Sequence, residues 1–400
     1  MKRLSYMINR ETNPYHNIAL EEYLLDHVAE DEVILYLWQN RKTVVIGYNQ
    51  NAWRECRVEA LSEDGGFVAR RLSGGGAVFH DLGNLNFTFL ARRADYDVEK
   101  QSEVILRAVQ SFGIPAIRNG RNDLTVEGRK FSGNAFYRRG DCCYHHGTIL
   151  IRADKGLMGN YLTVSKEKLK SKGVESVKSR VVNLEEYVPE LKVSQMEEAL
   201  VRAFGDVYGG AAEIIGKALE DGAVSGAEHV APEPYDMRRI DSGELEKRQE
   251  RFGSWEWLYG RKIPFQYEVS RKFSWGEVQI QLEVSEGVIR RAVVWTDAMD
   301  VGFSPYAEKR LEGVRYRKEE LMRKLEQSLE AEQPEAEQLE AEQPEAKTSE
   351  AEQLEAEQPE AKPSEAEQPE AGKANRLEEG RLSMLADVIE CLMADSIQDS

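Results

Sequence analysis

Residues 70–84 read RRLSGGGAVFHDLGN, in which an arginine pair precedes three consecutive glycines. A backbone without side chains can turn sharply and bring its amide N–H groups close to phosphate oxygens. The stretch has neither the Gly-Lys-Ser/Thr of a P-loop nor the GxGxxG spacing of a dinucleotide-binding turn. We interpret it as a ligand-binding loop with Arg71 as a source of charge. A plain glycine-rich turn beside a surface arginine pair fits the same residues.

A second stretch joins Asn122-Asp123-Leu124 to GRKFSGNA at 128–135. A lysine before a small-residue turn can point its ammonium into a pocket where a carboxylate and an α-phosphate must meet against their mutual repulsion. We predict that Lys130 takes this position, although a solvated lysine in a hairpin explains the pattern too. Asp123 is a weak candidate for holding Mg²⁺ and fits equally as a turn or capping residue.

A third stretch, HHGTILI at 145–151, begins with paired histidines. Neighbouring side chains on a strand point to opposite faces, so the pair is a poor two-ligand metal site and one histidine should face the pocket. His80 is a candidate general base or a structural histidine bonded to backbone. Cys142 and Cys143 are candidate nucleophiles, but nothing in the sequence marks either thiol as activated.

The pattern of apolar residues around these stretches predicts a mixed α and β layout. We expect strands over 33–38, 43–46, 66–70, 85–90 and 148–151, and helices over 16–28, 99–112 and 195–208. Between 209 and 250 the chain becomes rich in Gly, Ala, Glu and Pro, which indicates a boundary. Strict alternation over 278–284 and the turn signal Glu286-Gly287 then predict a small α+β domain that begins near Ser254.

Most of the negative charge lies in one low-complexity segment. Five-residue units of the AEQPE type begin at Ala331, and residues 331–370 carry fourteen Glu and two Lys, or −12 of the net charge of −18. Such a segment buries too little apolar surface to offset ordering entropy, so we expect 331–372 to be a disordered or extended insertion. Helices at 311–330 and 376–394 should flank it. The expected domains are therefore 1–245, and 254–330 together with 376–394.

Composition limits the cellular setting. No apolar run approaches the roughly 20 residues that span a bilayer, and the N-terminus lacks an apolar signal-peptide core. The four cysteines show no paired metal spacing. We expect a reduced cytoplasmic compartment, a monomer by default, and neither membrane nor nucleic acid as a partner.

The ordered set of motifs resembles the bacterial lipoate-protein ligase family. The similar segments are NIALEEYL at 17–24, LWQNRKTVVIGYNQNAWREC at 37–56, RRLSGGGAVFHDLGNLNFTF at 70–89, GRNDL at 120–124, GRKFSGNA at 128–135, HHGTILI at 145–151, KGVESVKSRVVNL at 172–184 and SWEW at 254–257. The resemblance covers about 2–330 and the last helix. It implies an α+β fold, with a biotin/lipoate ligase-type catalytic domain of mixed β-sheet and flanking helices and a small α+β C-terminal accessory domain.

The resemblance also implies an activity. Members of that family convert lipoate and Mg-ATP into lipoyl-adenylate, then transfer lipoyl to a lysine of 2-oxoacid dehydrogenase E2 subunits or the glycine-cleavage H protein. ATP would bind Arg71, Gly76, Ala77, Val78, Phe79 and Lys130. Lipoate would bind Lys130, Ser73, Gly74, Gly75, His80, Gly133 and Ala135. Asn84, Asn122, Asp123 and His146 would support the pocket.

Two other classes fit parts of the sequence. A cysteine-dependent octanoyl or lipoyl transferase would use the fold without ATP. A non-catalytic lipoate- or adenylate-binding scaffold would recruit partners through the acidic segment, although Lys130, Arg71 and the triple glycine are intact. A biotin ligase fits less well, because the glycine loop follows the lipoate pattern. Dependence on ATP separates the ligase from the transferase.

Overall fold

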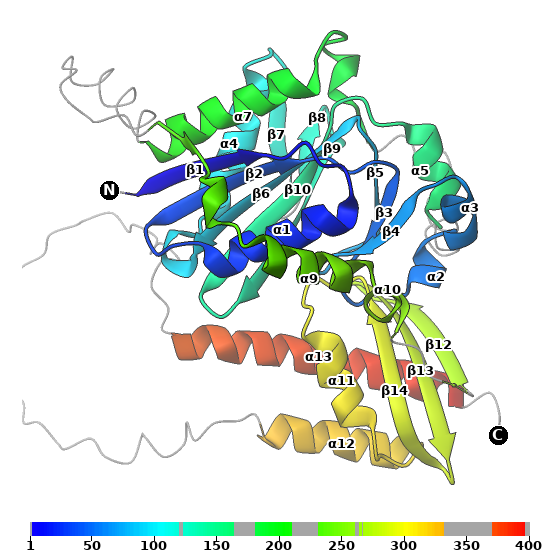
Figure 1. Cartoon of the computed structure of the whole chain (residues 1–400). Coiled ribbons are helices and arrows are strands. Elements are labelled where there is room, and N and C mark those ends of the chain that lie inside the picture. Colours follow the sequence, from blue (N-terminus) through cyan, green and yellow to red (C-terminus); the bar gives the residue numbers. More distant parts are fainter. Residues whose placement is uncertain are drawn as a thin grey trace, which may run out of the picture. The chain divides into compact units, whose positions relative to one another are not determined.

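The computed structural model describes residues 2–119, 123–163, 181–209, 231–260, 264–265, 267–331 and 370–396 (Figure 1). The chain divides into two compact units, and each is described by itself. The first comprises Met1–Lys262 and Trp295–Val301; the second comprises Ile263–Val294 and Gly302–Ser400. The acidic array expected over 331–372 lies almost wholly outside the described residues.

The first unit is built on an eight-stranded sheet of order β11-β1-β2-β6-β10-β9-β8-β7. β1 runs parallel to β2 and β11, whereas β2, β6, β10, β9, β8 and β7 are antiparallel to their successive neighbours. The strands are β1 (Arg3–Ile8), β2 (Glu32–Trp38), β6 (Asn84–Arg92), β7 (Ala116–Asn119), β8 (Asp123–Val126), β9 (Arg129–Arg139), β10 (Cys142–Leu150) and β11 (Glu233–Pro234).

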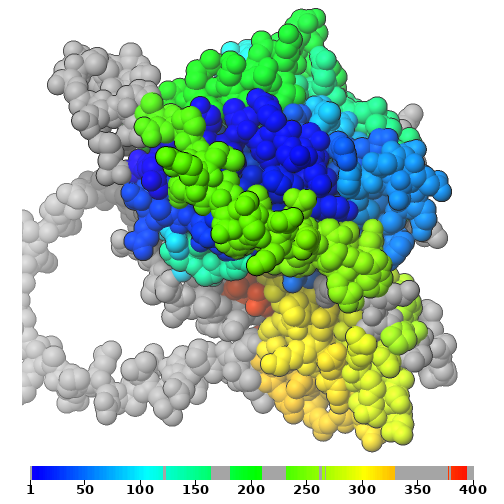
Figure 2. Space-filling model, viewed as in Figure 1, coloured from blue at the N-terminus to red at the C-terminus, as the bar shows by residue number. Residues whose placement is uncertain are grey.

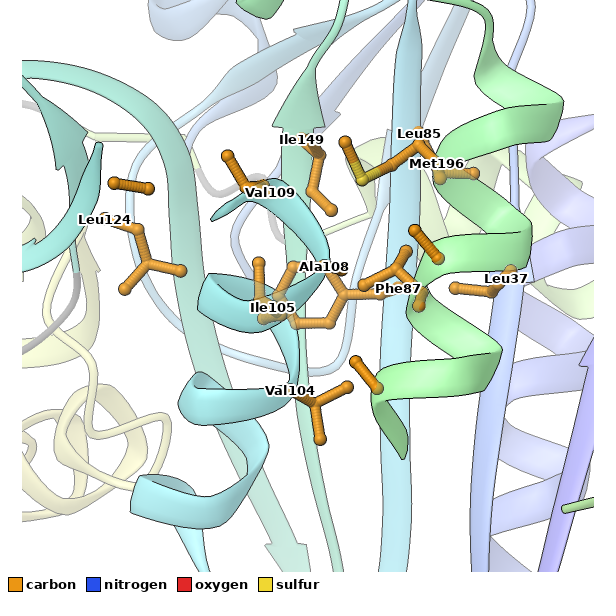
Figure 3. Close-up of a cluster of buried hydrophobic side chains, with 14 of the residues drawn as sticks. Leu37, Leu85, Phe87, Val104, Ile105, Ala108, Val109, Leu124, Ile149 and Met196 are labelled. Carbon is orange, nitrogen blue, oxygen red and sulfur yellow. The ribbon is translucent and has the colours of Figure 1, made fainter. Parts of the chain in front are cut away.

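Helices cover both faces of this sheet (Figure 1). α4 (Val98–Gln110) and α7 (Val193–Tyr208) cover one face, and α1 (Pro14–His27) and α9 (Ser242–Gly253) cover the other. All of β2 is buried because its alternate side chains enter two cores. Val33, Leu35 and Leu37 join the core under α4 and α7, part of which Figure 3 shows. Ile34, Tyr36 and Trp38 pack against α1.

A smaller sheet of order β4-β3-β5 carries the glycine-rich stretch. It consists of β3 (Thr43–Ile46), β4 (Phe67–Arg70) and β5 (Val78–His80), with the three glycines in the β4–β5 connection. The short helices among the described residues of this unit are α2 (Ala52–Glu55), α3 (Val58–Glu63), α5 (Lys155–Tyr161) and α10 (Trp255–Tyr259). Thr43 of β3 pairs with His80 of β5, which brings the end of the glycine stretch beside the residues that precede β3.

In the part of the second unit that the structure describes, the sheet β12-β13-β14 is combined with three helices. Its elements are β12 (Tyr267–Lys272), β13 (Glu277–Ser285), β14 (Val288–Thr296), α11 (Phe303–Leu311), α12 (Lys318–Ala331) and α13 (Glu370–Ser396). The turn expected at Glu286-Gly287 is present, and both residues have positive φ, at 53° and 72°. The strand alternation buries Val278, Ile280 and Leu282 against the helices.

Several elements differ from the sequence-based expectation. β1, β7, β8 and β9 were not predicted, and β10 begins at Cys142 rather than Thr148. The helix expected over 311–330 corresponds to α12, which begins only at Lys318, because α11 ends at Leu311 and the chain turns at Gly313 (φ 81°). The stretch 254–260 belongs to the first unit rather than opening the second. Among the described residues no helix is long and apolar enough to cross a membrane.

Candidate functional site

A cavity of about 410 Å³ lies in the first unit. Its walls come from α1, the ends of β2 and β3, the glycine loop, β5, β6, the β8–β10 hairpins and the segment Trp295–Val301. The predicted site residues that line it are Arg71, Gly75, Gly76, Ala77, Val78, His80, Asp123, Lys130, Gly133, Ala135 and His146. Stretches that are far apart in the sequence therefore meet around one space.

Four other predicted residues are not among the cavity-lining residues. Ser73 and Gly74 belong to the glycine loop but are buried, and Asn84 is fully buried. Phe79 packs into the core of the small sheet against Tyr161. Phe79 alternates with Val78 and His80 on β5, so its side chain must point away from the face they share. Asn122 lies outside the described residues.

The structure adds residues that sequence reasoning missed. The lining also includes Ile18, Glu21, Trp38, Val45, Asn86, Asn134, Gly147, Thr148, Asp297 and Met299. All of them except Asp297 and Met299 lie within the segments that resemble the ligase family, so their place in those segments was a usable signal. Asp297 and Met299 lie more than two hundred residues from the glycine loop and carried none.

Lys130 stands at the start of β9, after a tight turn in which Glu127 and Gly128 have φ of 51° and 76°. Its Nζ forms an ion pair with Asp123 Oδ1 at 2.7 Å. The side chain crosses Gly133, where an added Cβ would come within 2.8 Å of both Cε and Nζ. Gly133 therefore makes room for the lysine. Asp123, expected as a magnesium ligand, is the counterion of Lys130 here.

Arg71 shapes the glycine loop from inside. Its guanidinium is buried and donates to the carbonyl oxygens of Gly74 (2.7 Å), Gly76 (2.8 Å) and Val45 (3.2 Å) and to Ser73 Oγ (3.1 Å). Burial is the main reason that the pKa of Arg71 falls to about 10, so the group remains charged at neutral pH. The positive charge of Arg71 is therefore used in the first place to hold the carbonyl groups of the glycine loop through hydrogen bonds.

A buried chain of hydrogen bonds supports the loop from the sheet. Ser73 Oγ lies 2.7 Å from His146 Nε2, and His146 Nδ1 lies 2.8 Å from Glu21 Oε1. Thr88 donates to the same carboxylate oxygen at 2.7 Å. This arrangement links α1, β10 and the loop, which gives Ser73 a supporting position behind the cavity.

The two histidines of the third stretch point to opposite faces, as the strand alternation predicts. His146 lines the cavity. His145 lies on the other face, 3.1 Å from both Gln101 Oε1 and Asn134 Oδ1. Desolvation, strengthened by neighbouring positive charge, lowers the pKa of His145 to about 3, so the ring is neutral near pH 7.

His80 is also buried and neutral. Its Nδ1 lies 3.2 Å from Asn40 Nδ2, so its partner is a side chain and not the backbone. Desolvation, with smaller effects from Arg71 and His146, lowers its pKa to about 3. A ring that is so hard to protonate is a poor general base at neutral pH.

Acid should destabilise the fold through these two rings. Their folded pKa values lie below the unfolded value of about 6.5, so the unfolded chain binds protons first and stability is lost as the pH falls. Each ring should contribute a slope approaching about 1.4 kcal/mol per pH unit below that value. Urea midpoints measured between pH 7.5 and 5 should fall accordingly, and His145→Gln should lose about half of the slope. Midpoints independent of pH in this interval would contradict the expectation.

The thiols lie outside the cavity lining. Cys142 and Cys143 are buried in β10, and desolvation raises the pKa of Cys143 to about 11. Cys56 is also buried, and its pKa rises to about 12 for the same reason. A thiol in such surroundings is not the thiolate that nucleophilic catalysis requires. The structure therefore does not favour the cysteine-dependent transferase.

No group of three or more His, Cys, Asp or Glu side chains within the described ranges is arranged to hold a metal ion. Mg²⁺ commonly binds through one or two carboxylates together with substrate phosphates and water. Of the carboxylates that line the cavity, Glu21 is bonded to His146 and Thr88, and Asp123 and Asp297 fit only that supporting kind of contact.

Family models match most of the described chain. The model described as the lipoyl protein ligase A/B catalytic domain matches residues 13–205, and that of the bacterial lipoate protein ligase C-terminus matches residues 262–343. The second match begins where the first unit ends. Lipoate-protein ligase A of Psychrobacter cryohalolentis is 34% identical over 325 residues, or 81% of this chain and 92% of that protein.

Solved structures show the same fold. LipL1 of P. falciparum, solved in complex with lipoate, has a TM-score of 0.65 and 29% identity over 80% of this chain and 94% of that chain. A bi-partite lipoate protein ligase from Thermoplasma acidophilum has a TM-score of 0.53 and 23% identity over 67% of this chain and all of that chain. The expected fold class is thereby confirmed. With the motifs gathered around one cavity and a relative matched over nearly its whole length, the chain belongs to the lipoate-protein ligase A family.

Proposed function

We propose that this enzyme activates lipoate with ATP to lipoyl-adenylate and passes the lipoyl group to a lysine of an acceptor domain. The observation that carries the proposal is the cavity itself, because Lys130 and the Arg71-shaped glycine loop line one space and no cysteine does. Ile18, Trp38 and Val45 add an apolar wall. The cavity thus offers charge for two anions and a surface for an acyl chain.

The first step joins two anions. A carboxylate oxygen of lipoate bonds to the α-phosphorus of ATP while the bond to pyrophosphate breaks. We assign Lys130 to both groups, with its ammonium exchanging Asp123 for the carboxylate and an α-phosphate oxygen. We assign Arg71 and the cavity-lining stretch Gly76-Ala77-Val78 to the nucleotide, whereas Phe79 serves only to anchor the end of this stretch in the core of the small sheet. Placement and charge neutralisation then replace a covalent nucleophile.

The second step forms an amide. The neutral amine of an acceptor lysine attacks the acyl carbonyl carbon, AMP leaves with the bonding electron pair, and the amine loses a proton. The T. acidophilum ligase was studied with its E2 lipoyl domain. We propose acceptors of that class, including E2 subunits and the glycine-cleavage H protein, for a monomer acting in the cytoplasm. Mg²⁺ would enter with the triphosphate, with Asp123 as its candidate contact.

The proposal is tested by lipoate-dependent pyrophosphate release from Mg-ATP, followed by mass spectrometry of an added lipoyl domain. Release that needs lipoate, together with a domain heavier by one lipoyl group, supports the ligase. Acyl transfer from a carrier without consumption of ATP would replace it with the transferase. Binding of lipoate without either reaction would leave the scaffold reading in its place.

The double variant Cys142→Ala/Cys143→Ala should keep pyrophosphate release within about 2-fold of wild type. Both thiols are buried and neither lines the cavity, so their removal changes packing in β10 rather than the chemistry. Initial rates at saturating lipoate and ATP measure this. A loss of 100-fold or more with an unchanged melting temperature would show that a thiol takes part.

A further inference from the structure

The side-chain amide of Asn17 has one orientation that its neighbours allow. Its Nδ2 lies 3.0 Å from the carbonyl oxygen of Glu11 and 2.9 Å from that of Gln39. Carbonyl oxygens only accept hydrogen bonds, so the NH₂ end must face them. The opposite end, Oδ1, accepts from Asn9 Nδ2 at 2.8 Å and from the Tyr36 hydroxyl at 3.2 Å.

This orientation fixes Asn40. Asn40 is fully buried, and its Oδ1 lies 3.0 Å from Asn17 Nδ2. If the Asn40 amide were reversed, two NH₂ groups would face each other, so Oδ1 must be the end beside Asn17. Asn40 Nδ2 is then the end 3.2 Å from His80 Nδ1. A donor that faces Nδ1 requires Nδ1 to accept.

His80 therefore carries its proton on Nε2. In a neutral imidazole one nitrogen donates and the other accepts, and Nδ1 is committed to accepting. The low pKa keeps the ring neutral near pH 7. Nε2 is buried and has no hydrogen-bond partner among the residues that the structure describes. An orphaned buried donor is destabilising, and His80 lines the cavity, so an acceptor on a ligand that reaches Nε2 would remove this cost.

We propose that the Nε2–H of His80 is a fixed, neutral hydrogen-bond donor to an anionic oxygen of the bound lipoate or its adenylate, and that Asn17 and Asn40 set this tautomer. The inference rests on the proposed function. It assigns His80 to binding an oxygen rather than to taking up a proton. Such a donor adds attraction for the oxygen without adding another charge beside Arg71 and Lys130.

The first comparison is between His80→Gln and His80→Phe. A glutamine amide nitrogen can take the place of imidazole Nε2 and donate, whereas phenylalanine fills the space without a donor. We expect Phe to weaken binding about 10-fold or more and Gln to recover most of the loss. Calorimetric titration with lipoate alone and with Mg-ATP alone shows whether a carboxylate or a phosphate oxygen is the acceptor. Equal affinities for wild type, Gln and Phe with both ligands would overturn the proposal.

The second comparison tests the tautomer through Asn40→Asp. A carboxylate at position 40 accepts from Nδ1–H, so a neutral His80 would present a lone pair at Nε2 to the substrate oxygen. At pH 8 the variant should bind the ligand about 10-fold or more weakly than wild type. Its affinity should recover as the pH falls, because the imidazolium donates from both nitrogens. The charged or titratable groups lining the same cavity are Glu21, Arg71, Asp123, Lys130, His146 and Asp297. These groups titrate in both proteins, so their effect cancels in the ratio of the variant's ligand affinity to that of wild type at each pH. An affinity ratio that does not change with pH contradicts the assignment.

The tautomer of His80 can also be measured directly in the wild-type protein, without either variant. Long-range ¹⁵N NMR of ligand-free wild type should show His80 protonated on Nε2, whereas protonation on Nδ1 would overturn the proposal. Wild-type pyrophosphate release is measured in parallel. If release is absent, the proposed function fails, while the tautomer is still decided by the NMR spectrum.

Discussion

Lys130→Ala is expected to reduce lipoate-dependent pyrophosphate release by about 10³-fold. Lys130 is the lysine placed by β9 at the cavity, beside Asp123 and over Gly133. Without its ammonium, the carboxylate and the α-phosphate meet with their repulsion uncompensated, and removal of one such electrostatic contact typically costs 10²- to 10³-fold. Stopped-time pyrophosphate assays at saturating substrates measure the loss.

Arg129→Ala is the matched control. Arg129 precedes Lys130 on the same strand, bonds to Glu186 Oε2 and the Tyr187 hydroxyl, and is absent from the cavity lining. It should retain activity within a few fold. If the two variants lost activity equally, or if Lys130→Ala kept more than a tenth of the wild-type rate, the central role of Lys130 in adenylation would be wrong.

The sequence was sufficient for elements that carry a run or a helical period of apolar residues. β2, β3, α1, α4 and α7 were all predicted close to their observed bounds, although α1 also carries the buried polar residues Asn17 and Glu21. β9 and the first half of β10 were missed for a physical reason. One face of these strands lines a polar cavity through Lys130, Gly133 and His146, so the apolar alternation that identifies a strand is interrupted.

The candidate site likewise divides into residues that local motifs predict and residues that they do not. Local motifs predicted the glycine loop and Lys130, and eleven of the predicted residues line the cavity. What no local motif could provide is the set of long-range partners. Asn40 reaches His80 only because β3 pairs with β5, and Asp297 reaches the cavity only because the chain returns to the first unit at Trp295–Val301.

Gly74→Ala should damage the enzyme through this returning segment. A Cβ at position 74 would lie 2.3 Å from the Ala298 carbonyl oxygen and 2.7 Å and 2.8 Å from the carbonyl oxygen and Cα of Met299. These are backbone atoms, so the loop or the segment must move, which should cost about 1–3 kcal/mol.

A shift of the loop by about 1 Å should also lower pyrophosphate release about 10²-fold. Gly76→Ala makes the same chemical change two residues away, where nothing lies within 4 Å of the added carbon, and its melting temperature should stay near that of wild type. The measurements are the melting temperatures of both variants and the rate of pyrophosphate release by Gly74→Ala. Equal melting temperatures for the two would mean that the loop does not pack against Ala298 and Met299 in solution.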